Sequence, residues 1–157
     1  MTAPAVMVSS PRARAVRASW VRLVREGPVA PDRVRIKGPA DVHALLKDRA
    51  AAELVEVFYV LCLDSQSQVI ALAEVTRGTL SSSLVHPREV FRIAIAVGAA
   101  GVIIAHNHPS GDPTPSADDR EATRQLVDAG RILGVPVYDH VIEAGERYVS
   151  FAEASLL

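Results

Sequence analysis

The spacing of apolar positions divides the chain from residue 33 onward into strands and helices. Runs of β-branched and other apolar residues predict strands, at residues 33–37, 56–63, 68–77, 102–105, 135–142 and 147–151. Apolar residues at helical spacing, each set preceded by a Pro or Ser start signal, predict helices at residues 39–52, 87–99 and 116–133. The second and third strands read as a hairpin. These elements predict an α/β fold, a mixed β-sheet flanked by helices.

The N-terminal residues 1–32 are predicted to form a separate segment. Residues 1–10 read as a leader, and Ser10-Pro11 is typical of a helix start. Apolar residues then recur at helical spacing until Gly27-Pro28 ends the helix near residue 26. Arginines fill much of its other face, at positions 12, 14, 17, 22 and 25. We therefore expect a leader with a basic amphipathic helix at 1–32 and one folded domain at 33–157.

Composition narrows the class of protein. Of 157 residues, 49% are apolar and 22% charged, which suits a folded domain and excludes disorder across the whole chain. A single cysteine, Cys62, excludes an internal disulfide and a multi-cysteine zinc site, and we expect it in the core. The apolar run at 93–105 is shorter than the ~20 residues of a membrane span, so we expect no membrane partner. No secretory signal is recognisable, which favours the cytoplasm.

The net charge of −1 conceals an uneven distribution along the chain. Residues 1–55 carry 10 Lys/Arg against 5 Asp/Glu, whereas residues 56–157 carry 7 against 13. The arginine-rich helix could contact nucleic acid. The alternative, which we favour, is that it docks on an acidic surface, because a net charge near zero gives little attraction to phosphate.

Candidate chemistry concentrates where the buried strand 102–105 ends. His106 and His108 follow it at i and i+2, so their rings leave on one face about 6–7 Å apart. A loop stiffened by three prolines leads to the helix whose first turn holds Asp119. Two imidazoles and one carboxylate form a typical catalytic zinc set with a fourth position for water. The alternatives are a His pair with ordinary polar partners and a capping role for Ser116-x-x-Asp119.

The spacing of these residues resembles the JAMM (MPN+) metalloprotease motif, a His-x-His pair, seven residues, Ser, two residues and Asp. The surrounding sequence is similar to the RadC-like branch of that superfamily from about residue 33 to the C-terminus. The similar stretches are Gly78-Thr79-Leu80, Val85-His86-Pro87-Arg88-Glu89, residues 105–116, Asp139-His140 and Arg147-Tyr148-Val149-Ser150. The resemblance implies a JAB/MPN domain with the layered architecture of cytidine deaminases.

The resemblance also implies a site. Zn²⁺ would be held by His106, His108 and Asp119, although iron, cobalt and manganese accept the same ligands. Ser116 would donate a hydrogen bond to an oxyanion, and an upstream glutamate would act on the water. Glu56 and Glu89 compete for that last role. We favour Glu56, which directly precedes an apolar strand, because Glu89 could instead cap its helix or pair with a nearby arginine.

The implied function is a zinc-dependent hydrolase that cleaves a peptide or isopeptide bond of an unidentified protein or peptide substrate. The alternative is a DNA-repair-associated accessory protein whose metal site is structural or vestigial. The helix-hairpin-helix region of longer RadC-like proteins has no counterpart in residues 1–32, which weakens that alternative. An oligomer is compatible with either function.

Several further polar residues each have two alternative roles. Asp139-His140 could orient a metal ligand or form a core pair. Asp112 could be a stray ligand or a turn residue, and His86 could face the site or cap a helix. His43 is expected to face solvent.

Overall fold

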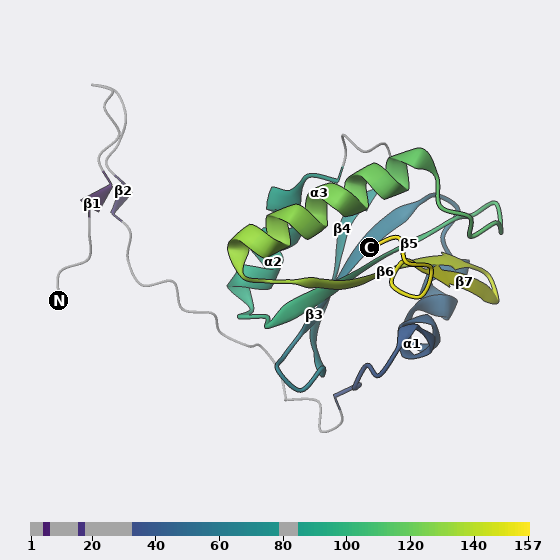
Figure 1. The fold of residues 1–157 in the computed structure, drawn as a ribbon, viewed down its shortest axis with the longest axis horizontal. Helices are drawn as coiled ribbons and strands as arrows, with labels where there is room; N and C mark the ends of the chain where they lie inside the picture. The colour runs from purple at the N-terminus through teal and green to yellow at the C-terminus, as the bar shows by residue number, and fades with distance from the viewer. Residues whose placement is uncertain (1–4, 7–15, 18–32, 79–84) are drawn as a thin grey trace.

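The computed structural model describes residues 5–6, 16–17, 33–78 and 85–157 (Figure 1). Its centre is a five-stranded sheet with the order β4-β3-β5-β6-β7. The strands are β3 (Val57–Leu63), β4 (Val69–Arg77), β5 (Gly101–Asn107), β6 (Val137–Ala144) and β7 (Arg147–Ser150). β5 and β6 are parallel, and all other neighbours are antiparallel. The predicted mixed sheet and the predicted β3–β4 hairpin are therefore confirmed.

Helices cover both faces of this sheet (Figure 1). α1 (Pro39–Ala51) packs on one face, where Val42 and Leu46 join a core with Leu61 and Ile103. α2 (Pro87–Ala96) and α3 (Ala117–Leu133) pack on the other face. The result is a three-layer α/β domain, in agreement with the predicted fold class. None of the helices among the described residues is long and apolar enough to cross a membrane.

The two central strands, β3 and β5, are buried at every position. Such strands are apolar on both faces, which is why β5 reads as an apolar run rather than as an alternation. Successive side chains still point to opposite faces. Ile104 contacts the α2–α3 side and Ala105 the α1 side. The alternation places His106 on the α2–α3 side and Asn107 on the α1 side.

Local signals explain where the helices begin and end. Pro39 and Pro87 each occupy the first turn, where the missing N–H costs nothing. His86 caps α2, since its Nδ1 accepts the backbone N–H of Arg88 at 3.1 Å. This confirms the capping role for His86. Gly134 ends α3 with a φ of 69°, a backbone conformation that glycine adopts without strain.

Some elements differ from the predictions. The expected strand at 33–37 is reduced to an isolated bridge between Arg35 and Gln68, because α1 starts almost directly behind it. At Val16–Arg17 (β2) the structure has a two-residue strand paired with Ala5–Val6 (β1) instead of the expected helix. The rest of the predicted N-terminal helix lies outside the described residues.

Candidate metal centre

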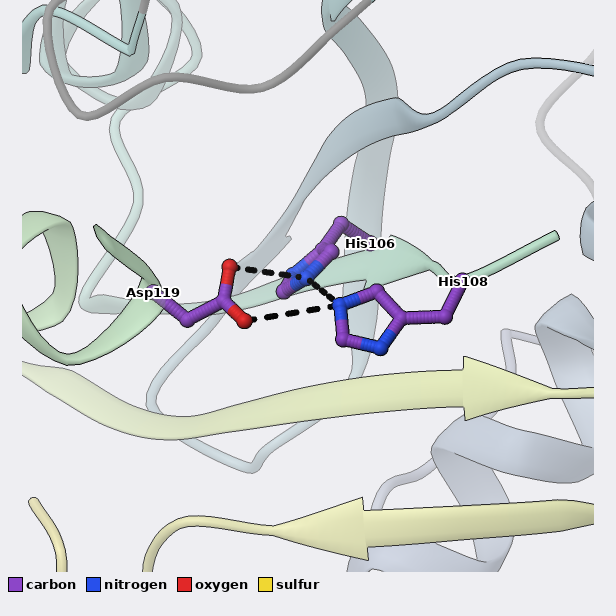
Figure 2. A group of neighbouring side chains, drawn as sticks. All are labelled: His106, His108 and Asp119. Carbon is purple, nitrogen blue, oxygen red and sulfur yellow. Dashed lines mark hydrogen bonds and ion pairs between the residues drawn. The ribbon is translucent and has the colours of Figure 1, made fainter. Parts of the chain in front are cut away.

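Three side chains from two elements converge at the C-terminal end of β5 (Figure 2). Nε2 of His106 lies 2.9 Å from Nε2 of His108 and 3.1 Å from Oδ1 of Asp119. Nε2 of His108 lies 3.4 Å from Oδ2 of Asp119. One ligand atom from each residue lies within 4.8 Å of the others. The structure therefore brings together the three predicted metal ligands.

The outer nitrogen of His108 fixes the tautomer of its neutral ring. Nδ1 lies 2.7 Å from the backbone carbonyl oxygen of Asp112. A carbonyl can only accept, so we assign the hydrogen to Nδ1. Nε2 of the neutral ring then carries a lone pair that points at the other two ligands.

A chain of three hydrogen bonds assigns His106 in the same way. The hydroxyl of Thr123 donates to the carbonyl oxygen of Asp119 at 2.6 Å. Its oxygen therefore accepts from Nδ1 of His140, also at 2.6 Å. Nε2 of His140 is then left to accept from Nδ1 of His106 at 2.8 Å. In this tautomer of His106, Nε2 also presents a lone pair to the group.

Two imidazole lone pairs and a carboxylate facing one another repel unless a cation lies among them. A divalent metal ion of borderline softness, such as zinc, fits this set of two nitrogen ligands and one oxygen ligand. The hydrogen bond with Asp119 raises the pKa of His108, so a proton can substitute for the metal. Burial alone would raise the pKa of Asp119, but the neighbouring imidazoles of His106 and His108 hold it well below its ordinary value in the metal-free protein. Burial lowers the pKa of His140, which keeps it neutral as the chain of hydrogen bonds requires.

The loop behind His108 is held by its own backbone and by β7. Gly111, at a φ of 80°, donates its N–H to the carbonyl of His108. The guanidinium of Arg147 donates to the carbonyl of Gly111. The carboxylate of Asp112 accepts hydrogen bonds from the backbone N–H and the hydroxyl of Thr114. These bonds are typical of a turn residue, the second of the two roles expected for Asp112. Asp112 therefore contributes its carbonyl, not its carboxylate, to the site.

Ser116 and Asp119 cap α3 at the same time as Asp119 faces the histidines. Oγ of Ser116 accepts the N–H of Asp119 at 3.0 Å, and Oδ2 of Asp119 accepts the N–H of Ser116 at 2.7 Å. The capping interpretation is thus confirmed, and it does not compete with ligation. A capping box fixes the carboxylate while Oδ1 still faces His106.

The two candidate glutamates lie in different surroundings. Glu89 forms ion pairs with Arg92 at 2.7 Å and with Arg88 at 3.3 Å on α2. Glu56 directly precedes β3 and lies two residues before Phe58, which pairs with His106. The negative charge of Glu56 contributes to the raised pKa of His108.

The Asp139-His140 pair has divided roles. His140 orients His106, whereas Asp139 accepts hydrogen bonds from the backbone of His140 and Ala152 and from the hydroxyl of Ser150. Asp139 therefore ties the C-terminal segment to β6. Cys62 is fully buried, as predicted.

Sequence reasoning missed three contributors at this end of the sheet. Thr123 lies one helical turn after Asp119, and that i,i+4 spacing was a usable signal. The prediction for His43 is wrong: its Nδ1 lies 2.5 Å from Oε2 of buried Glu143. The two residues are 100 positions apart, so no local pattern could have joined them. The amide of Asn107 bonds to the backbone on both sides of Glu56.

The comparisons with known proteins show to which family the chain belongs. The chain matches the RadC-like JAB domain over residues 36–156. It is 51% identical over 125 residues to the UPF0758 protein STH371 of Symbiobacterium thermophilum, covering 80% of this chain and 53% of that protein. It is 50% identical over 127 residues to a UPF0758 protein of Rubrobacter xylanophilus, covering 81% and 56%. The chain thus spans about half the length of these relatives. It belongs to the RadC-like JAB domain family.

Proposed function

We propose that this chain is a zinc-dependent hydrolase that cleaves a peptide or isopeptide bond. The observation that carries the proposal is the convergence of three electron-pair donors, His106, His108 and Asp119, at one point. The side chain of His106 is 1% exposed and that of His108 12%, so the group opens toward solvent on the His108 side. Three protein ligands with one open side are typical of catalytic rather than structural zinc.

Each protein group has a definite task in this proposal. Zinc held by the three ligands supplies Lewis acidity, which makes water more acidic and polarises a carbonyl group. Glu56 accepts a proton from the attacking water and delivers it to the leaving nitrogen. Ser116 already accepts a bond from Asp119, so its own hydroxyl hydrogen is the part that would stabilise a substrate oxyanion.

The completeness of the ligand set favours this function over a vestigial site. A DNA-associated accessory role would depend on the arginine-rich segment, most of which lies outside the described residues. No contact among the described residues favours it. The hydrolase therefore remains the stronger proposal.

The test combines metal content with cleavage. Protein purified without a histidine tag and loaded with zinc is incubated with a peptide library, and new termini are identified by mass spectrometry. We expect cleavage by the wild-type chain and a loss of at least about a hundredfold in Glu56→Gln, in line with the contribution of a general base. Glu89→Gln is the matched control and should cleave normally. Equal cleavage by wild type and Glu56→Gln, or none by zinc-loaded wild type, would contradict the proposal.

A further inference from the structure

Asn107 lies between the two histidine ligands, yet its side chain points to the opposite face of the sheet and is 2% exposed. Its Oδ1 accepts the N–H of Val57 at 2.7 Å, and its Nδ2 donates to the carbonyl of Val55 at 2.9 Å. These two backbone groups belong to the residues directly before and after Glu56. The amide therefore brackets Glu56 from both sides.

This contact replaces the backbone ladder where the ladder stops. The last residue pair between β3 and β5 is Phe58 with His106. Beyond it, the N–H of His108 turns to β6 and donates to the carbonyl of Glu143 at 2.8 Å. Without Asn107, the chain around Glu56 would lose its hydrogen bonds to β5. Through its carboxamide, Asn107 continues the hydrogen bonding between β5 and the chain at the start of β3.

Only a carboxamide of this length satisfies both backbone groups. The carbonyl of Val55 needs a donor and the N–H of Val57 needs an acceptor. Asparagine offers one of each from a single planar group, whereas aspartate at neutral pH only accepts. Leucine has a similar shape but would leave both backbone groups without a partner, at a substantial cost in a buried position.

The remaining backbone group at this point is held from the other side. The carbonyl of Glu56 accepts the N–H of Gly78, at the end of β4, at 2.9 Å. Gly78 has a φ of 118°, a backbone conformation that residues other than glycine rarely adopt. The backbone of residues 55–57 is thus held by β5 and by the end of β4, which limits how far the backbone of Glu56 can move.

From these contacts we propose that Asn107 is a positioning residue for Glu56. It couples the placement of the general base to the end of β5, which also places both histidine ligands. One short segment thereby sets the metal and the glutamate in a fixed relation. This inference rests on the proposed function, because it assigns a purpose to the position of Glu56.

The test uses cobalt, whose visible absorption reports on the groups around the ion, and compares full-length variants at one pH. The variants are Asn107→Ala, Glu56→Gln and the double variant, each loaded with Co²⁺. We expect Asn107→Ala to change the cobalt spectrum in the same direction as Glu56→Gln. The double variant should show the spectrum of Glu56→Gln without further change, because Asn107 acts through Glu56.

A second measurement, in the metal-free protein, follows the clamp, the pair of hydrogen bonds that Asn107 makes with the backbone of Val55 and Val57. In Asn107→Ala, hydrogen exchange at the amide of Val57 should accelerate about tenfold, as expected for one lost buried hydrogen bond. The matched control is Asp64→Ala, because Asp64 also bonds two backbone N–H groups, at the opposite end of β3. That control should leave both the cobalt spectrum and the Val57 amide unchanged.

The outcomes separate this inference from the proposed function. A normal cobalt spectrum in Asn107→Ala, or an additional change in the double variant, would overturn the positioning role and leave the hydrolase intact. If Glu56→Gln itself leaves the cobalt spectrum unchanged, Glu56 does not face the metal, and both proposals fall together. Unchanged exchange at Val57 would also overturn the clamp.

Discussion

Two histidine–carboxylate groups lie at the same end of the sheet, one on each face. On the α3 side, His106, His108 and Asp119 converge with their lone pairs directed at one point. On the α1 side, His43 meets Glu143 alone and packs its ring against Tyr148, at 4.9 Å between ring centroids. The first group has room for a cation among three donors. The second is a buried pair in which one side chain compensates the charge of the other.

The two groups also differ in the hydrogen bonds of the atoms that point away from the centre of each group. On the α3 side, each histidine has a partner for Nδ1 that sets its tautomer. On the α1 side, Oε1 of Glu143 has no hydrogen-bond partner among the described residues. Networks in which every polar group is satisfied are typical of sites that hold a ligand in a defined geometry. The comparison therefore predicts metal binding on one face and a purely structural role on the other.

The largest expected difference is in metal content. We expect about one zinc per chain in the wild type and none in a His106→Ala, His108→Ala double variant, since a single carboxylate cannot retain the ion. His43→Ala should keep its zinc. Mass spectrometry of untagged protein measures all three. Loss of zinc from His43→Ala with the fold intact, or zinc retained by the double variant, would break the distinction between the two faces.

The second prediction concerns stability on the α1 side. Removing His43 leaves Glu143 buried without its partner, which should lower the free energy of unfolding by about 3 kcal/mol near neutral pH. Urea unfolding of metal-free protein measures this loss. His86→Ala is the control, because His86 makes a single exposed capping bond and should cost less.

The pH dependence of this variant has a definite sign. Burial raises the pKa of Glu143, and the hydrogen bond from His43 counteracts that rise. In His43→Ala only the effect of burial remains, so the folded protein keeps a proton that the unfolded chain has released. Stability should then fall as pH rises through the folded-state pKa, and the loss should be smaller near about pH 5 than near about pH 8. A pH-independent loss would mean that the charge on Glu143 is not its cause.

The third prediction is a weaker effect on metal affinity. His140→Leu removes the acceptor for Nδ1 of His106, which should weaken zinc binding about 10–100-fold without abolishing it. Ser150→Ala is the control, since it loses a buried hydrogen bond to Asp139 but touches no ligand. Competition with a zinc chelator measures both variants. Equal affinities would contradict the role assigned to His140.

The α3 side was predictable from the sequence and the α1 side was not. The three ligands sit within 14 positions, His106 to Asp119, and each lies at the start or end of an element that periodicity locates. The sheet followed from the same patterns, since β3 and β5 are apolar runs bounded by turns. His43 and Glu143 are brought together only by the packing of α1 on β6. The strand predicted at 135–142 ends before Glu143, but β6 continues through Ala144.

Asn107 shows a different limit. Its neighbours in the sequence suggest a site residue, yet its partners are 50 and 52 positions away, at the start of β3 and just before it. Recognising the clamp requires the register of β3 against β5, which is fixed by the packing of both faces rather than by either strand alone. Metal ligands are recognised by residue type and spacing, whereas residues that support them are recognised by their contacts.

The smallest expected effect comes from Thr123, whose hydroxyl joins His140 to the backbone of Asp119. Thr123→Val keeps the shape but removes the hydroxyl, leaving Nδ1 of His140 without an acceptor. We expect the free energy of unfolding to fall by about 1–3 kcal/mol, the cost of an unsatisfied buried donor, and zinc binding to weaken less than in His140→Leu. Thr123→Ser retains the hydroxyl and should recover the hydrogen bonds. If valine and serine weaken zinc binding equally, packing rather than the hydroxyl is responsible.

Combining this change with the previous one tests whether the hydrogen bonds act as a chain. In a His140→Leu background, Nδ1 no longer exists, so Thr123→Val should weaken zinc binding by less than it does in the wild type. Equal effects in both backgrounds would mean that Thr123 supports Asp119 only through its backbone carbonyl. The α3 side would then resemble the α1 side, with separate local contacts instead of one network joining two ligands.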